Sequence, residues 1–283
     1  MVNYAPSWAG FPQGRLWRKL GRRGRDVSFA SLLLARIRFM RWLTETPVAH
    51  RGLHDLGRGR AENTASAFRA AMKAGYAIEC DVGLSADGVP VVFHDDSLGR
   101  LTGVDGPLES RTAAELMQLT VLGTKDTVPR LADLLELVAG KVPLLVELTG
   151  GRGRRGRLEP AVARLLADYR GPVAIQSFDP AMVTWFRRHA PGVLRGQISM
   201  NYAMEDDEEA PPARLRGPLT NLAFWRQNQP DFIAYDIRAL PNWAVARHRR
   251  AGVPVLAWTV RSAADRARAA LHADNVIFEH WRP

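Results

Sequence analysis

Cysteine is almost absent from this sequence: Cys80 is the single cysteine among 283 residues. One cysteine excludes a framework of intramolecular disulfide bonds and a metal site built from thiolates. This usage fits a reducing compartment, so we expect a cytoplasmic protein. The Arg22-Arg23 pair is a feature of twin-arginine export signals. However, arginines interrupt the apolar segment that follows it and a small-residue cleavage site is missing, so we do not expect export.

Long apolar runs are also lacking. The best candidate, residues 29–43, contains Arg36, Arg38 and Arg41 and falls short of the ~18 apolar residues that span a bilayer. Apolar residues in this segment recur at helical spacing, which predicts an amphipathic helix. Two placements are open for that helix, because it can pack on the protein core or lie along a lipid headgroup layer.

Acidic residues are scarce near the N-terminus. Residues 1–46 hold nine basic and two acidic residues and so carry +7 of the formal net charge of +10. We therefore predict a basic N-terminal extension over residues 1–46, which is either a solvated arm or a peripheral contact with an anionic membrane surface. The segment lacks a platform of basic and aromatic residues and any recognisable nucleic-acid motif, so we expect no nucleic-acid partner.

From residue 47 onward, short β-branched runs alternate with helical patterns, which is typical of βαβ units in a parallel sheet. Single barrels of this kind need roughly 250 residues. We predict an α/β fold, a (β/α)8 TIM-like barrel over residues 47–283. The roughly 35 residues after the third strand exceed a plain connection and predict a short insertion there. The predicted strands are residues 47–50, 77–82, 90–94, 143–148, 173–177, 194–198, 232–236 and 253–260.

Carboxylates occur inside runs whose apolar character predicts burial. Strand alternation places Glu79 and Asp81 on one face, and Glu147 lies in the apolar run 143–148. Burying neighbouring carboxylates is costly unless a positive charge compensates. A divalent cation supplies that charge, and oxygen ligands without cysteine favour Mg²⁺ or Ca²⁺. The alternative is that arginine side chains neutralise these acids without a metal ion.

Two histidines end predicted strands, His50 the first strand and His94 the third. Active sites of such barrels gather at the C-terminal ends of the strands, so the two imidazoles can face one another across a substrate. Histidine titrates near neutral pH. One ring can therefore accept a proton from a nucleophile while the other donates one to a leaving group.

Arg51 follows His50 directly and can offer a planar, charged fork to a phosphate. Strand alternation would turn its side chain away from His50, so this role requires the chain to bend at Gly52. His54 and Asp55 lie in a polar loop, where we expect them to be exposed.

Four short blocks follow one another along the chain: His50-Arg51-Gly52, Glu62-Asn63-Thr64, Glu79-x-Asp81 and His94-Asp95. In this order and spacing they resemble the signature of the glycerophosphodiester phosphodiesterase family, within the barrel superfamily of phospholipase C-like phosphodiesterases. The resemblance covers residues 47–283 and is much more specific than any one block.

The resemblance implies an enzyme that hydrolyses glycerophosphodiesters to sn-glycerol 3-phosphate and an alcohol, through a cyclic phosphate formed by the glycerol 2-hydroxyl. It implies that His50 and His94 are the catalytic acid/base pair. It further implies that the metal ligands are Glu79, Asp81 and Glu147.

The resemblance also implies substrate contacts. Arg51 would bind the phosphate, Glu62 and Asn63 would support the metal or substrate shell, and Trp258 would pack against the glycerol moiety. One departure concerns the lysine that usually follows two residues after the last metal-binding glutamate, because Thr149 stands there. The side chains that could fold back to replace its charge are Arg152, Arg154 and Arg155.

A second departure lies near the C-terminus, where Ile277-Phe278-Glu279 replaces the usual Ile-Thr-Asp run and leaves substrate selection at the rim open. Two rival functions also stay open. One is a phospholipase D-like hydrolase of lysophospholipids, which the basic amphipathic N-terminus would suit. The other is a non-catalytic barrel that binds phosphodiesters or anionic membranes.

Overall fold

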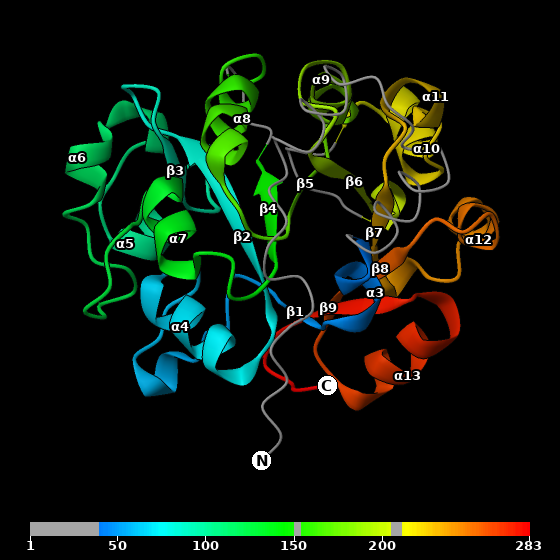
Figure 1. Ribbon diagram of the computed structural model, residues 1–283, viewed down its shortest axis with the longest axis horizontal. Coiled ribbons are helices and arrows are strands. Elements are labelled where there is room, and N and C mark those ends of the chain that lie inside the picture. The colour runs from blue at the N-terminus through cyan, green and yellow to red at the C-terminus, as the bar shows by residue number, and fades with distance from the viewer. Residues whose placement is uncertain (1–39, 150–153, 205–210) are drawn as a thin grey trace, which may run out of the picture.

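Eight parallel strands close into a barrel in the computed structural model, which describes residues 40–149, 154–204 and 211–283. They are β1 (Val48–Ala49), β2 (Ala77–Leu84), β4 (Leu144–Leu148), β5 (Val173–Ser177), β6 (Leu194–Ser199), β7 (Phe232–Asp236), β8 (Val255–Val260) and β9 (Asn275–Phe278). The order around the barrel is β1-β9-β8-β7-β6-β5-β4-β2, and β2 pairs again with β1. The predicted (β/α)8 TIM-like class is therefore confirmed (Figure 1).

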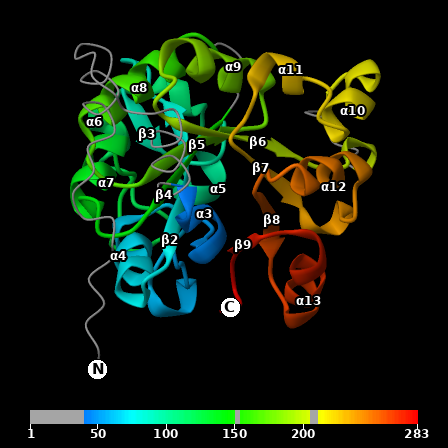
Figure 2. The same ribbon diagram turned by 45° about the vertical axis from the view of Figure 1, so that its right-hand side comes forward.

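Helices join successive strands and cover the outside of the barrel (Figures 1 and 2). The first of them shows how local sequence sets the bounds, because it follows Thr64 and ends where Gly75 adopts a φ of 78°. Its buried face carries Ala67, Phe68 and Ala71. The longer connecting helices are α4 (Ala65–Ala74), α7 (Leu131–Val138), α8 (Leu158–Asp168), α9 (Pro180–His189), α10 (Ala213–Thr220), α12 (Trp243–Arg250) and α13 (Ala263–His272).

The third predicted strand is not part of the barrel. β3 (Pro90–Val92) pairs antiparallel with β2 as the second arm of a hairpin. Five residues separate the two strands, far fewer than the dozen or so that a crossover to a parallel neighbour needs. The hairpin returns the chain to the barrel rim, where the Phe93 N–H donates to the Asp81 carbonyl at 3.0 Å. The eighth barrel strand is instead β9, which the sequence prediction missed.

The predicted insertion after the hairpin is present and has its own small core. It holds the short helices α5 (Gly99–Thr102) and α6 (Ala113–Leu116), which lie on the same side of the barrel as β3 in Figure 1. Its apolar side chains bury one another in a cluster separate from the barrel interior. The members include Phe93, Leu98, Leu101, Leu108, Leu116 and Val128.

Side chains fill the barrel interior at the N-terminal ends of the strands. The short helix α3 (Trp42–Glu45) inserts Trp42 and Leu43 into this interior, where they are 5% and 0% exposed. Phe232 occupies the space beside Gly196, where a Cβ atom would lie 2.2 Å from its ring. Residues 42 and 43, which fall within the predicted extension, thus belong to the barrel core. The remainder of the predicted amphipathic helix lies almost entirely outside the described residues.

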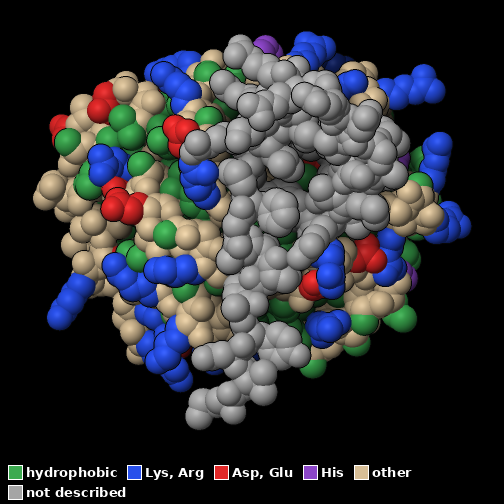
Figure 3. Space-filling view, in the orientation of Figure 1, with side chains coloured by type: hydrophobic (Ala, Val, Ile, Leu, Met, Phe, Trp, Pro, Cys, Tyr) green, Lys and Arg blue, Asp and Glu red, His purple; other side chains and the backbone are tan. Residues whose placement is uncertain are grey.

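In the part of the chain that the structure describes, no helix is long and apolar enough to cross a membrane. On the face drawn in Figure 3, lysine and arginine side chains are distributed around the periphery, with acidic side chains between them. This mixed surface agrees with the charge count, since most of the net positive charge belongs to residues 1–46.

Candidate active site

Three carboxylates converge at the C-terminal rim of the barrel. Glu79 and Asp81 come from β2, and Glu147 comes from β4, where it pairs in register with Asp81. Each offers an oxygen atom that lies within 4.8 Å of the others. Glu79 and Asp81 are 0% and 1% exposed. Adjacent parallel strands thus bring together the three residues that the sequence predicted as metal ligands.

The electrostatics of this acidic cluster call for a positive charge. Burial, together with the charges of Asp81 and Glu147, raises the pKa of Glu79 well above its ordinary value. Burial and the charge of Asp81 likewise raise the pKa of Glu147. One oxygen of Glu79, Oε1, is buried and accepts no hydrogen bond from the described residues. An acceptor of this kind, beside two further carboxylates, fits a hard cation that prefers oxygen ligands.

Arg51 contacts this cluster, and the chain does bend beside it. Arg51 has a φ of 52° and Gly52 a φ of 78°, where a Cβ atom would lie 2.9 Å from the Phe68 ring. The bend lets the Arg51 backbone N–H donate to Glu79 Oε2 at 2.8 Å. Its guanidinium lies 3.1 Å from Asp81 Oδ2. Arginine pairing therefore offsets part of the acidic charge, but one guanidinium leaves two of three ionised carboxylates uncompensated.

Asn63 fixes the orientation of Asp81. Its side-chain amide donates to Asp81 Oδ2 at 2.8 Å, and its carbonyl oxygen accepts from the Asp81 backbone N–H at 3.2 Å. Asn63 is 3% exposed and has a φ of 57°, a conformation that asparagine tolerates better than most residues. The structure thus places this residue against Asp81, one of the three residues that the sequence predicted as metal ligands.

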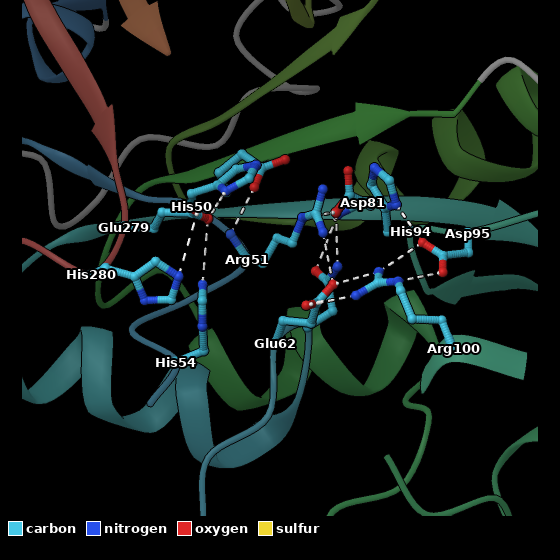
Figure 4. A network of polar contacts seen from close by, with 12 residues as sticks. His50, Arg51, His54, Glu62, Asp81, His94, Asp95, Arg100, Glu279 and His280 are labelled. Carbon is cyan, nitrogen blue, oxygen red and sulfur yellow. Dashed lines mark hydrogen bonds and ion pairs between the residues drawn. The ribbon is translucent and has the colours of Figure 1, made fainter. Parts of the chain in front are cut away.

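A chain of ion pairs links Arg51 to His94. The Arg51 guanidinium donates to Glu62 at 2.7 Å, and Arg100 donates to both Glu62 oxygens. Arg100 also holds Asp95 through two hydrogen bonds of 2.6 and 2.7 Å. Asp95 in turn lies 2.6 Å from Nδ1 of His94. Figure 4 shows this chain of contacts between Arg51 and His94.

Hydrogen bonds from two arginines keep the Glu62 carboxyl group ionised. Burial alone would raise its pKa, but the hydrogen bonds from Arg100 and the charges of Arg51 and Arg100 lower the pKa to about 2. Glu62 is therefore ionised at neutral pH. The structure places it between two guanidinium groups, where it fixes their positions at the edge of the site.

His50 is held by Glu279, which directly follows β9. Its Nδ1 lies 2.6 Å from Glu279 Oε2, and its side chain is 15% exposed. Burial lowers the pKa of His50 although the hydrogen bond to Glu279 opposes that shift. For Glu279 burial acts in the raising direction, but the hydrogen bond with His50 and the nearby imidazole of His54 hold its pKa well below the ordinary value. Burial thus favours the neutral form of the His50 ring, and the tautomer with a proton on Nδ1 can donate to the Glu279 carboxylate.

The two histidines open on different cavities. A cavity of about 540 Å³ is lined by His50, Arg51 and Glu279. A larger cavity of about 1190 Å³ is lined by His94 and Glu147, and it continues over an apolar wall. The apolar wall consists of Phe178, Trp185, Met200, Tyr202, Leu219 and Phe224.

The substitution at Thr149 has a structural counterpart. Arg154 returns to this position, where it donates to Thr149 Oγ1 at 2.9 Å and is 2% exposed. Two carboxylates, Glu109 and Asp96, each lie 2.7 Å from the same guanidinium. A fixed cation thus lies beside Thr149, but its charge is shared by two acids. Of the other two arginines considered, Arg155 pairs with Asp179, and residue 152 lies outside the described residues.

Trp258 rises from β8 into the barrel mouth. Its ring meets Phe178 edge to face, with the ring centroids 5.5 Å apart. The indole nitrogen is buried and has no acceptor among the described residues. This position is compatible with the expected packing against a glycerol moiety, and it leaves an N–H available to a substrate oxygen.

Sequence reasoning missed three residues around the site. Glu279 contacts His50 from 229 positions away, and Arg100 contacts Glu62 from 38 positions away. His54 was expected to be exposed, but its side chain is only 13% exposed and lies against Glu279. An ionisable residue directly after the apolar run 275–278 was the available signal, since Glu147 also lies near the end of such a run.

The fold and its rim define a class: TIM barrels that gather acidic, basic and imidazole side chains in one site at the C-terminal ends of the strands. Within this class, the chain belongs to the Glycerophosphoryl diester phosphodiesterase family, whose sequence profile matches residues 50–280. This confirms the family predicted from the motifs.

Individual relatives agree with this assignment. The chain is 27% identical over 244 residues to YhdW of Bacillus subtilis, which covers 82% of this chain and 93% of YhdW. A glycerophosphodiester phosphodiesterase of Thermotoga maritima has a similar structure, with a TM-score of 0.63 and 25% identity over 82% of this chain and 94% of that one. A phosphodiesterase of Oleispira antarctica, solved with the product sn-glycerol 3-phosphate, has a TM-score of 0.69 at 24% identity, over 83% and 92% of the respective chains.

Proposed function

We propose that this protein hydrolyses glycerophosphodiesters to sn-glycerol 3-phosphate and an alcohol, with the aid of a divalent cation. The observation that supports this best is the buried acidic cluster of Glu79, Asp81 and Glu147 beside Arg51 and two histidines. Membership of the family supports the substrate class. The product in the Oleispira antarctica structure guides the choice of assay.

In this proposal Glu79, Asp81 and Glu147 hold the cation, with Mg²⁺ or Ca²⁺ the best match to three oxygen ligands. When bound, the cation supplies Lewis-acid stabilisation of the charge on the phosphoryl oxygens. Asn63 keeps Asp81 oriented through two hydrogen bonds. With a cation bound, Asp81 would be neutralised, and the Arg51 guanidinium could then offer the phosphate a planar fork.

The two histidines carry protons. The Nδ1–H of His50 donates to Glu279, so its Nε2 holds the lone pair that accepts the proton of the glycerol 2-hydroxyl. The 2-oxygen then bonds to phosphorus as the bond to the leaving alcohol breaks. His94, whose Nδ1 is engaged by Asp95, gives a proton to that alcohol. Water then opens the cyclic phosphate to yield glycerol 3-phosphate, with the two rings exchanging roles.

This mechanism requires one substrate to contact both histidines, although the two line different cavities. A phosphodiester seated at the acidic cluster must therefore extend into both cavities, and Arg51 lines the one that holds His50. Arg51 is the side chain that both the acidic cluster and Glu62 share.

The test is the release of glycerol 3-phosphate from a panel of glycerophosphodiesters. We expect release with Mg²⁺, Ca²⁺ or Mn²⁺, none after exhaustive chelation, and recovery when the cation is returned. The variants His50→Ala and His94→Ala should lose activity by at least about 100-fold, whereas His272→Ala should not. Residue 272 ends α13, which runs from the C-terminal end of β8 to the N-terminal end of β9, far from the rim.

Each result addresses one part of the proposal. Full turnover after chelation would count against the metal site, and normal turnover in either histidine variant would remove that histidine from the mechanism. A panel that releases no glycerol 3-phosphate would overturn the substrate class.

A second candidate function has an observation in its favour. The apolar wall of the larger cavity offers several side chains to an acyl chain, which suits a lysophospholipid substrate. Turnover of lysophosphatidylcholine in vesicles, compared with that of glycerophosphocholine, separates the two functions. A clear preference for the lysophospholipid would favour the phospholipase D-like activity, and the basic N-terminal extension would then be the first segment to test for membrane contact.

A further inference from the structure

A second group of metal-binding side chains lies next to His50, outside the acidic cluster. It consists of His54, Glu279 and His280, each of which offers an atom within 4.8 Å of the other two. We call these residues the imidazole cluster. His54 Nε2 lies 3.6 Å from Glu279 Oε2, and His280 Nε2 lies 3.8 Å from Glu279 Oε1. All three residues line the cavity of about 540 Å³.

The spacing suits a tetrahedral ion. Ligands about 2.0–2.1 Å from zinc lie about 3.4 Å from one another. One ligand atom of each residue lies within 4.8 Å of the others, so the longest separation must shorten by at most about 1.4 Å. His280 is 63% exposed and can adjust, and the cavity provides an open fourth position. Figure 4 shows the rings of His54 and His280 directed toward Glu279 from two sides.

Independent of spacing, His54 has an unused ligand atom. Its Nε2 is buried and has no hydrogen-bond partner among the described residues, because Glu279 is too distant for a hydrogen bond. A buried imidazole nitrogen without a partner is uncommon.

The donor atoms distinguish this cluster from the acidic one. Three carboxylates suit Mg²⁺ or Ca²⁺, whereas two imidazoles and a carboxylate suit Zn²⁺ and related transition ions. The two sites should therefore fill with different ions from one mixture. Arg261 also binds Glu279 and would oppose a cation, but its side chain is 54% exposed and can turn into solvent.

Occupancy of this site would act on His50 through Glu279. The carboxylate that holds His50 Nδ1 would donate its electrons to the metal ion instead. We propose that the imidazole cluster is a second metal site, selective for Zn²⁺-like ions, and that its occupancy inhibits hydrolysis by withdrawing Glu279 from His50. The inhibitory half rests on the proposed function, whereas the binding half does not.

Binding is tested by calorimetric titration of the full chain with ZnCl2 while a large excess of Ca²⁺ fills the acidic cluster. We expect one Zn²⁺ site in the unmodified protein and in His272→Gln. Affinity should fall at least about 100-fold in His54→Gln/His280→Gln, because loss of a supporting partner alone costs up to that much. Titration with Co²⁺, followed by its visible absorption, should report a low-coordinate imidazole site in the first two proteins and not in the double variant.

The single variant His280→Gln provides a second measurement, because its exposed position makes misfolding improbable as a cause of lost binding. Equal Zn²⁺ affinity in all the proteins, or no Zn²⁺ site under Ca²⁺ excess, would overturn the proposed site. The inhibitory role is tested by the rate of glycerol 3-phosphate release. For each protein, the rate with Zn²⁺ is divided by the rate without Zn²⁺. We expect strong inhibition of the unmodified protein and at least tenfold weaker inhibition of the double variant.

Failure of the two proposals can be told apart. Zn²⁺ binding that depends on His54 and His280, in a protein without phosphodiesterase activity, would retain the site and reject the function. An active enzyme whose zinc inhibition is the same with and without these histidines would reject the inhibitory role.

Discussion

Replacing Glu79 by glutamine should separate stability from cation binding. Glutamine keeps the shape of the side chain and an oxygen that accepts the Arg51 backbone N–H, now bonded to Glu79 Oε2 at 2.8 Å. The substitution removes one of three buried acidic groups that repel one another. It also removes Glu79 Oε1, a buried acceptor without a hydrogen-bond partner among the described residues. An unsatisfied buried polar group costs about 1–3 kcal/mol. In chelator, Glu79→Gln should therefore be at least as stable as the unmodified protein.

In the presence of the cation, the unmodified protein should be more stable than Glu79→Gln. A ligand at a hundred times its dissociation constant stabilises the folded state by about 2.7 kcal/mol. For a domain of this size, 1 kcal/mol corresponds to about 2–4 °C, so the unmodified protein should gain roughly 5–10 °C in Tm from Ca²⁺. Glu79→Gln should gain less than about 2 °C.

The assay is thermal unfolding of both proteins in chelator and in Ca²⁺. Glu136→Gln serves as the control, because Glu136 is exposed on α7 and should respond to Ca²⁺ as the unmodified protein does. An equal Ca²⁺ gain in Glu79→Gln would refute the reasoning. So would an unmodified protein that gains nothing.

Three further predictions concern the core and the ion pairs of the site. Leu43→Ala should destabilise the protein by about 2–5 kcal/mol in chemical denaturation, because Leu43 is fully buried inside the barrel; a loss below about 1 kcal/mol would contradict that packing. Glu62, with a pKa of about 2, should stabilise the fold above pH 4.5 and lose that effect as pH falls toward 2. At pH 6 the free energy of unfolding of Glu62→Gln should be about 1–2 kcal/mol below that of the unmodified protein, after allowance for solvent screening. This difference should narrow by pH 3, and a constant difference would argue against the ion pair. Arg100 positions Asp95, which in turn holds His94. Arg100→Gln should therefore lower kcat about tenfold with little change in KM, and Arg100→Lys should restore part of the loss. A change in KM alone would contradict this role.

Much of the fold was predictable from local patterns. Alternating strand and helix patterns predicted the barrel class, and seven of its eight strands correspond to predicted ones. The error at residues 90–94 has a local cause: an apolar run shows a strand but not its partner, and only the short turn before β3 restricts it to a hairpin. β9 was missed because four residues carry too little pattern, although it closes the barrel between β1 and β8.

The site was predictable to the extent that its residues follow strands. Glu79, Asp81 and Glu147 meet because adjacent parallel strands end at one rim. The partners of the two histidines were not predictable, because Glu279 reaches His50 only after the chain closes the barrel. The chain from Arg51 to Arg100 likewise depends on how the insertion packs, which no spacing in the sequence encodes.

The most direct measurement is a crystal structure of the protein with Ca²⁺ bound. We expect a Ca²⁺ ion about 2.3–2.6 Å from oxygen atoms of Glu79, Asp81 and Glu147, with Glu79 Oε1 among them. We also expect the Arg51 guanidinium to have moved away from Asp81. Electron density that holds no ion there in an active, Ca²⁺-saturated enzyme, with Arg51 still paired to Asp81, would contradict both expectations.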